Sequence, residues 1–236
     1  MNMNDLKKPS GTRKASPRRK VRVGRPPKEL AGEVEERILD AARKVFLERG
    51  FEGASMDEIA AAARAGKPTI YARFPNKRAL FTAVVMRDVV SRIEQFAIDV
   101  PTGATVEERL ASAGATALDF TLNSERMGMT RLAIAEARRF PDLASTSNRT
   151  ARERSTEMAA RLLGAMAQSG ELATLPAFAP ERLSTTARFF LDLVVVPILF
   201  QALFRQDLEP LRAEIGPHVA RSVVFFLAAC RNGGVT

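Results

Sequence analysis

The sequence predicts an all-α protein, and three observations lead to this fold class. Ala, Leu, Arg and Glu, which mostly favour helices, dominate the 236-residue chain. Apolar residues recur at helical spacing through most of it. Capping residues, glycines and prolines stand where helix ends need them. With 46% hydrophobic residues, the chain can fill a sizeable core, and its length suits a small domain joined to a larger one.

The first predicted helix covers residues 33–49, "EVEERILDAARKVFLER". Acids crowd its start, as the helix dipole favours, and Gly50 supplies a C-terminal stop. Its apolar positions fall on one face, which we expect to be buried. These positions are Val34, Ile38, Ala41, Ala42, Val45 and Phe46.

Two short helices are predicted next, separated by a tight turn. "SMDE" at 55–58 is a capping box, in which Ser55 caps the helix over 56–63 and Glu58 reaches back. Gly66 allows a sharp turn, Pro68 suits a first helical position and Pro75 ends the following helix.

The second short helix carries Ile70 and Phe74, four residues apart, which should face inward. Asn76 can cap the next, longer helix. Residues 64–78 contain five Lys/Arg and no acid. The pattern predicts a helix-turn-helix with a cationic second helix, the arrangement that lies in a DNA major groove. The alternative is an accidental basic patch on a small bundle.

The stretch "ILDAARKVFLERGFEGASMDEIAAAARAGKPTIYARFPNKRALF" resembles the DNA-binding domain of the TetR/AcrR transcriptional regulators, over about residues 33–85. The chain departs from the family pattern in the turn and at the entry to the second short helix. It has Arg64 where the family usually has glycine, Gly66 in place of serine, and Pro68 where glycine or alanine is frequent. The matching positions include Ala41, Ala42, Phe46, Gly50, Phe51, Ile59, Ala60, Ala63, Thr69, Ile70, Tyr71, Phe74, Lys77 and Leu80.

The resemblance implies a homodimer that places residues 67–73 of each subunit in a major groove of a palindromic operator. Phosphate contacts would position the protein and base contacts would specify the sequence. Tyr71 has a second interpretation, as a ring packed on the first helix with its hydroxyl in water. Arg73 could reach either a guanine or a phosphate. The expected DNA contacts from the helix-turn-helix are Ser55, Arg64, Lys67, Pro68, Thr69, Tyr71, Arg73 and Lys77.

The basic excess of the chain lies in residues 1–28, a segment with ten Lys/Arg and one acid. The remaining 208 residues have 26 basic and 26 acidic residues, so their net charge is zero. The segment is rich in Pro, Ser and Gly, and we expect a disordered arm. Its "RVGRPPK" resembles an AT-hook, and Arg22 and Arg25 could enter the flanking minor groove. A solubilising leader is the alternative.

From about residue 86 onward, the sequence predicts further helices. The sequence thus divides into the arm at 1–28, a TetR-type DNA-binding domain at 29–80 and a ligand-binding and dimerisation bundle at 81–236. "RRFPDLA" at 138–144 is similar to the AefR-like branch of the family. Two long, apolar final helices are expected to form the dimer interface, or else core within one chain. The predicted helices cover 78–99, 104–122, 125–139, 142–169, 180–206 and 209–230.

A small-molecule effector would bind in this bundle. Methionine and aromatic side chains could line an apolar cavity, although such residues more often form ordinary core. Asp192 is expected to pair with Arg188, one helical turn away. The predicted pocket residues are Asp119, Phe120, Met127, Leu132, Glu136, Met158 and Leu162.

The sequence argues against an enzyme and predicts neither a metal site nor a cofactor. The single histidine, His218, has no companion for a metal site and is expected at the surface or in a capping role. Cys230 is expected to be inert, and a single cysteine suits the cytoplasm. The longest apolar stretch is interrupted by Asp192 and Pro197, which favours a buried helix over a membrane span.

The predicted function is a ligand-responsive repressor; the alternative is a sequence-tolerant, nucleoid-type DNA-binding protein.

Overall fold

The protein is described by a computed structural model for residues 28–94, 101, 103–168 and 170–233. Within those residues it is built from α-helices and two short 3-10 helices, with no strand. The α-helices are α1 (Lys28–Gly53), α2 (Met56–Ala62), α3 (Lys67–Arg73), α4 (Lys77–Glu94), α5 (Val106–Thr121), α6 (Ser124–Ala135), α7 (Pro141–Met166), α8 (Leu183–Val194), α9 (Val196–Leu203) and α10 (Glu209–Arg231). The 3-10 helices are η1 (Glu171–Thr174) and η2 (Pro176–Phe178).

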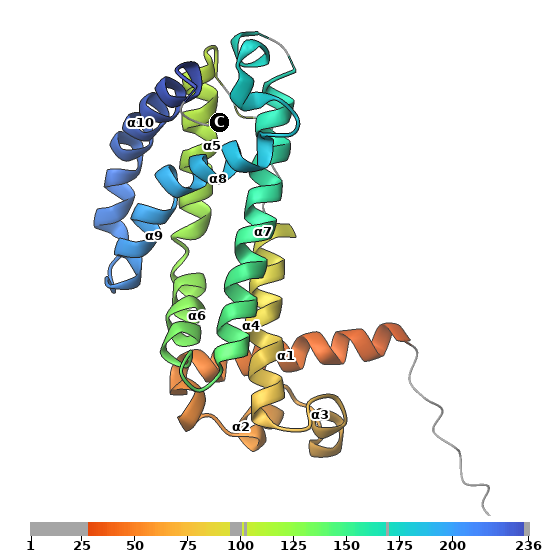
Figure 1. The fold of residues 1–236 in the computed structure, drawn as a ribbon. Coiled ribbons are helices and arrows are strands. Elements are labelled where there is room, and N and C mark those ends of the chain that lie inside the picture. Colours follow the sequence, from red (N-terminus) through yellow and green to blue (C-terminus); the bar gives the residue numbers. More distant parts are fainter. Residues whose placement is uncertain (1–27, 95–100, 102, 169, 234–236) are drawn as a thin grey trace, which may run out of the picture.

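The helices form two connected parts (Figure 1). Helices α1, α2 and α3 gather at one end, and we call them, with the first half of α4, the head. Helices α5 to α10 form the larger part, the bundle, in which α8 crosses between α7 and α10. Helix α4 contacts α1 in the head and α7 in the bundle, so it spans both parts. The all-α prediction is confirmed.

The head has its own apolar core. The inward positions expected along the first three helices are buried, with Ile38, Phe46, Ile59 and Ile70 fully inaccessible to solvent. Val34 is an exception and is only half-buried. Gly50 interrupts α1 with a φ of 68°, in the left-handed region that glycine adopts readily. The prediction of a glycine stop at this residue is therefore confirmed, although a short helical turn continues to Gly53.

The predicted single helix over 180–206 is wrong. Helices α8 and α9 are separate and meet at a bend of 42°. Pro197 explains the break, because it has no N–H to donate and its ring clashes with the carbonyl of residue 193.

Helix α10 supplies partners for the carbonyls at this break. Ser222 Oγ donates to Leu193 O over 3.3 Å. His218 Nε2 lies 2.9 Å from Val194 O. The capping role expected for His218 is confirmed, and the bend is fixed by tertiary contacts.

The C-terminal helices α9 and α10 expose large apolar side chains. Phe204, which ends α9, is 76% exposed, and Phe225 on α10 is 72% exposed. Phe200 and Val224 are also more than half exposed. By length and composition alone, α10 and the bent pair α8–α9 could each cross a membrane, a test that core helices of soluble proteins also pass.

Candidate nucleic-acid interface and ligand cavity

Helix α3 is fixed to the head from one side only. Ile70 is fully buried and Phe74 is 7% exposed, which confirms the expected inward face. On the opposite side Tyr71 is 45% exposed. Pro68 lies in the first turn, where its missing N–H leaves no unsatisfied donor. The helix is thus held by its apolar residues while its polar and aromatic side chains face solvent.

The turn before α3 contains Arg64 in a left-handed conformation, with a φ of 49°. An L-residue there costs about 1–2 kcal/mol relative to the right-handed form. The position is the one where the resemblance leads us to expect glycine. The head tolerates this strain and gains a cation at the edge of α3.

The cations of α3 have partners within the head. Lys67 Nζ lies 2.7 Å from Asp57 Oδ2 of α2. This hydrogen bond and the charge of Asp57 raise the pKa of Lys67. Arg73 Nη1 donates to Thr69 O over 3.4 Å. Both side chains are therefore oriented by protein contacts, and their role in DNA contact stays a prediction.

Lys77 lies at the start of α4 and points back toward the end of α1. Its Nζ donates to Glu52 O over 3.1 Å and to Ala54 O over 2.9 Å. The ammonium also lies 4.7 Å from the centroid of the Phe51 ring. An ammonium has three N–H donors, so one remains for the predicted phosphate contact.

The predicted caps are partly confirmed. Ser55 Oγ accepts from Glu58 N over 3.1 Å, and Asn76 Oδ1 accepts from Ala79 N over 2.9 Å. The return half of the capping box is not made, because the Glu58 carboxylate pairs with Arg49 at 3.6 Å instead. Arg22 and Arg25, the predicted minor-groove contacts, lie outside the described residues.

The link between head and bundle was missed by sequence reasoning. Phe140, which precedes α7, packs against the rings of Phe51 and Phe81 with centroids 4.8 and 5.5 Å away. Arg139 pairs with Glu52 beside it. The "RRFPDLA" stretch therefore docks the bundle onto the head. The available signal was an arginine pair next to an aromatic residue, but nothing in the sequence specified the partner.

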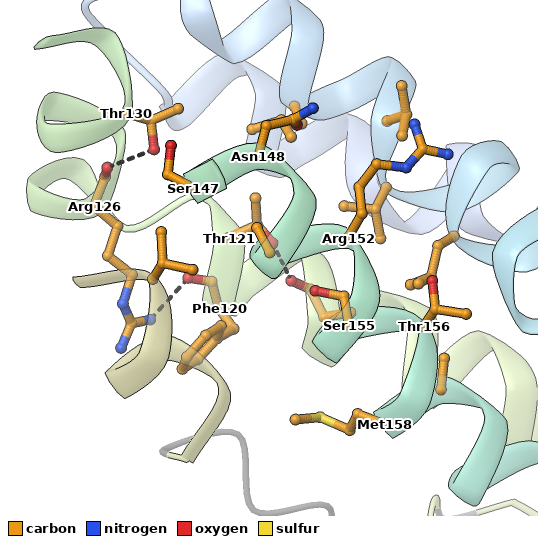
Figure 2. A pocket seen from close by; sticks show the side chains of 18 of the residues that line it. Phe120, Thr121, Arg126, Thr130, Ser147, Asn148, Arg152, Ser155, Thr156 and Met158 are labelled. Atoms are coloured by element: carbon orange, nitrogen blue, oxygen red, sulfur yellow. Dashed lines mark hydrogen bonds between the residues drawn. The ribbon is translucent and has the colours of Figure 1, made fainter. Parts of the chain in front are cut away.

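A cavity of ≈ 570 Å³ lies among helices α4 to α9 of the bundle. This size falls within the range of small-molecule sites, about 300–1,000 Å³. Three of the predicted pocket residues, Phe120, Met158 and Leu162, are part of its wall. Figure 2 shows polar side chains of α7 along the same cavity. The polar lining residues from this helix are Ser147, Asn148, Arg152, Ser155 and Thr156.

The other predicted pocket residues lie elsewhere. Asp119 is on the outer side of α5, where it pairs with Arg212 at 3.3 Å. Met127 is buried in the core of the bundle. Leu132 packs on the core of the head, and Glu136 pairs with Arg139 at 3.6 Å. The sequence does not specify the rotational phase of these helices, and one residue of error in that phase rotates a side chain by about 100°.

Two polar groups of the cavity have partners that the sequence did not indicate. Asp192 lies 3.6 Å from Arg152 of α7, so the pair expected with Arg188 is wrong. Packing of α7 against α8 brings Arg152 close. At the other side of the cavity, the Arg126 guanidinium lies 3.6 Å from the centroid of the Phe120 ring and donates to Phe120 O over 2.9 Å (Figure 2).

The described residues contain no cluster of His, Cys, Asp and Glu able to hold a metal ion. Cys230 is 1% exposed, and burial raises the pKa of its thiol to about 11. A thiol with so high a pKa is a poor nucleophile at neutral pH.

Both the head and the bundle match models of known protein families. Residues 38–84 match the family of bacterial regulatory proteins named tetR. Residues 108–232 match the C-terminal domain of AefR-like transcriptional repressors, so this match alone covers more than half of the chain.

The similarity to individual known proteins covers both the head and the bundle. The transcriptional regulator UidR of Escherichia coli K12 is 29% identical over 189 residues, 76% of this chain and 90% of UidR. A TetR-family regulator structure from Mesorhizobium loti MAFF303099 has 25% identity and a TM-score of 0.70, covering 84% of this chain and 97% of its own. The structure of the flavonoid-responsive regulator FrrA has 27% identity and a TM-score of 0.60, covering 85% and 98%. The chain thus belongs to the TetR family of DNA-binding transcriptional regulators, with an AefR-like C-terminal domain.

Proposed function

We propose that the protein is a homodimeric, ligand-responsive repressor acting on a palindromic DNA operator in the cytoplasm. The observation that carries this proposal is the one-sided attachment of α3. Ile70 and Phe74 hold the helix, while Lys67 and Tyr71 face solvent in a stretch without acids. A short cationic helix held in this way fits a major groove.

Dimerisation is supported by the exposed apolar side of α9 and α10. Contiguous apolar patches on a monomer's surface often mark association sites. The Phe200 and Phe204 rings form one such patch, because their centroids lie 5.1 Å apart and both side chains are more than half exposed. A single helix of seven residues offers few base contacts, whereas two such helices about one DNA turn, roughly 34 Å, apart read a palindrome.

Regulation by an effector is supported by the position of the cavity. Helices α4 and α6 line it and also contact α1 of the head. A ligand that shifts either helix would change the separation of the two α3 helices and lower affinity for the operator. The effector is proposed to be small and largely apolar, as the similar FrrA is named for its response to flavonoids.

A nucleoid-type role remains as the second candidate because of the +9 charge in residues 1–28. Such an arm could bind phosphates without regard to sequence. The two functions differ in specificity: a repressor prefers its operator to random DNA by several kcal/mol.

Selection of bound sequences from random DNA tests the proposal, and a recovered palindrome is the expected result. On that operator, the double substitution Lys67→Ala and Tyr71→Ala should weaken binding about 100-fold in a gel-shift titration, from two lost contacts of about 1–3 kcal/mol each.

Arg154→Ala is the matched control, since Arg154 is exposed on α7, in the bundle. It should leave operator affinity unchanged. Recovery of no preferred sequence would favour the nucleoid-type role. Full affinity in the double variant would contradict recognition by α3.

A further inference from the structure

The cavity of the bundle has a polar border on the side where α7 faces α8. A second hollow, a groove of ≈ 800 Å³, lies there between α7 and the start of α8. The two hollows share four wall residues, which we call the junction. The junction consists of Asn148, Arg152, Thr156 and Arg188.

The junction is a continuous feature of the fold. Asn148, Arg152 and Thr156 are spaced by four on α7, which places them on one face of that helix. Arg188 reaches the same place from α8, the helix packed against α7. A molecule that extends from the cavity into the groove must pass these four side chains.

The junction has an excess of positive charge. Arg152 and Arg188 share this border of the cavity with one carboxylate, that of Asp192, which lies 3.6 Å from Arg152. That separation is long for a hydrogen bond. Arg188 is exposed and makes no hydrogen bond or ion pair with any residue that the structure describes. Its five N–H donors are thus directed to solvent or to a ligand.

The opposite side of the cavity differs, because its charged groups are engaged within the protein. The Arg126 guanidinium stacks on the Phe120 ring. Asp88 is buried and lies 3.5 Å from Arg43. Between the two sides the wall is largely apolar, including Met158, Leu162 and Phe190.

We propose that the effector is an amphipathic oxyanion, with its apolar body in the cavity and a carboxylate or phosphate head at the junction. The planar guanidinium of Arg188 matches either head in a two-point contact, and Arg152 adds a second cation. Asn148 and Thr156 supply neutral donors to the remaining oxygens. This inference rests on the proposed role of the cavity as the effector site, and it specifies the chemical class.

Titration calorimetry with three probes of equal chain length tests the inference: dodecanoate, dodecyl phosphate and dodecanol, all below their micellar concentrations. The wild-type protein should bind at least one anion about tenfold or more tightly than dodecanol, because hydrogen bonds to charged groups are stronger than neutral ones. The better of the two anions identifies the head group.

The double substitution Arg152→Gln and Arg188→Gln should remove this preference and leave the affinity for dodecanol unchanged. Arg188→Lys keeps the charge and should retain part of the preference. Arg154→Gln, outside both hollows, should behave as wild type. Circular dichroism confirms that the variants fold.

Equal affinity of the wild type for dodecanol and both anions would overturn the inference while leaving the proposed repressor intact. Anion preference that survives in the double glutamine variant would also overturn it. Failure of all three probes to bind would overturn both the inference and the effector role of the cavity, without affecting operator recognition. Conversely, if the protein shows no operator specificity but still prefers the anions, only the proposed repressor function is contradicted, and the inference about the effector stands.

Discussion

The head and the bundle differ in how completely their interiors are filled. In the head, the rings of Phe46, Phe51, Phe81 and Phe140 lie with centroids 4.8 to 6.1 Å apart. In the bundle, a cavity of ≈ 570 Å³ lies between the helices. A close-packed core transmits strain and resists deformation, whereas a cavity lined by methionine and small polar residues can adapt to a ligand. The part that presents α3 is thus the rigid one, and the part suited to a ligand is the adaptable one.

The interiors of the head and the bundle are connected through a few side chains. Met129 and Phe140 lie some fifty residues beyond the end of the head in the sequence, yet both side chains belong to its core. Gly128 permits this approach, since a Cβ there would lie 2.9 Å from Leu47 of α1. Movement of α6 or the start of α7 therefore acts directly on the packing of the head.

The strongest test of the difference compares one residue from each interior. Phe140→Ala removes a buried ring from the head and should lower the free energy of unfolding by about 3–5 kcal/mol. Met158→Ala at the cavity wall should cost about 1 kcal/mol or less, because the side chain is only half-buried and already borders open space. Urea unfolding measures both. Equal losses would mean that the two interiors are packed alike.

A smaller loss of stability is expected from substitutions where α10 contacts the bend between α8 and α9. His218→Ala leaves the Val194 carbonyl without its side-chain partner and should destabilise the protein by about 1 kcal/mol. Arg221→Ala, at an exposed site on the same helix, is the control and should be neutral. Equal unfolding midpoints for His218→Ala and wild type would show that the His218 contact does not stabilise the bend.

The smallest change in stability is expected in the turn before α3. Arg64→Gly relieves the left-handed strain, partly offset by the entropy of glycine, and should stabilise the head by up to about 1 kcal/mol. It should also weaken operator binding by removing a cation. Arg64→Ala removes the cation but keeps the strain, so only operator binding should fall. Thermal unfolding and gel shifts separate the two effects; stabilisation by both substitutions would contradict a conformational cause.

Prediction from the sequence succeeded where local patterns specify the structure. Ile70 and Phe74 could be oriented because helix α3 is bounded by Pro68 and Pro75 and their spacing allows only one buried face. Prediction failed in the bundle, where Asp119 lies beside Phe120 on α5, and Met127 lies on the neighbouring helix α6. There, the cavity wall itself includes polar side chains, such as Asn148 and Thr156 of α7, so periodicity does not distinguish a cavity wall from core or from an exposed face.

The sequence by itself determined the helices of the head, the inward face of α3 and its cationic surroundings, since spacing, caps and prolines are local properties. Only the tertiary structure decided that Phe140 completes the core of the head, that Arg152 rather than Arg188 pairs with Asp192, and that α8 and α9 bend against His218. The physical reason is that these contacts join residues far apart in the chain. Their partners depend on how helices pack, and no short-range pattern encodes that choice.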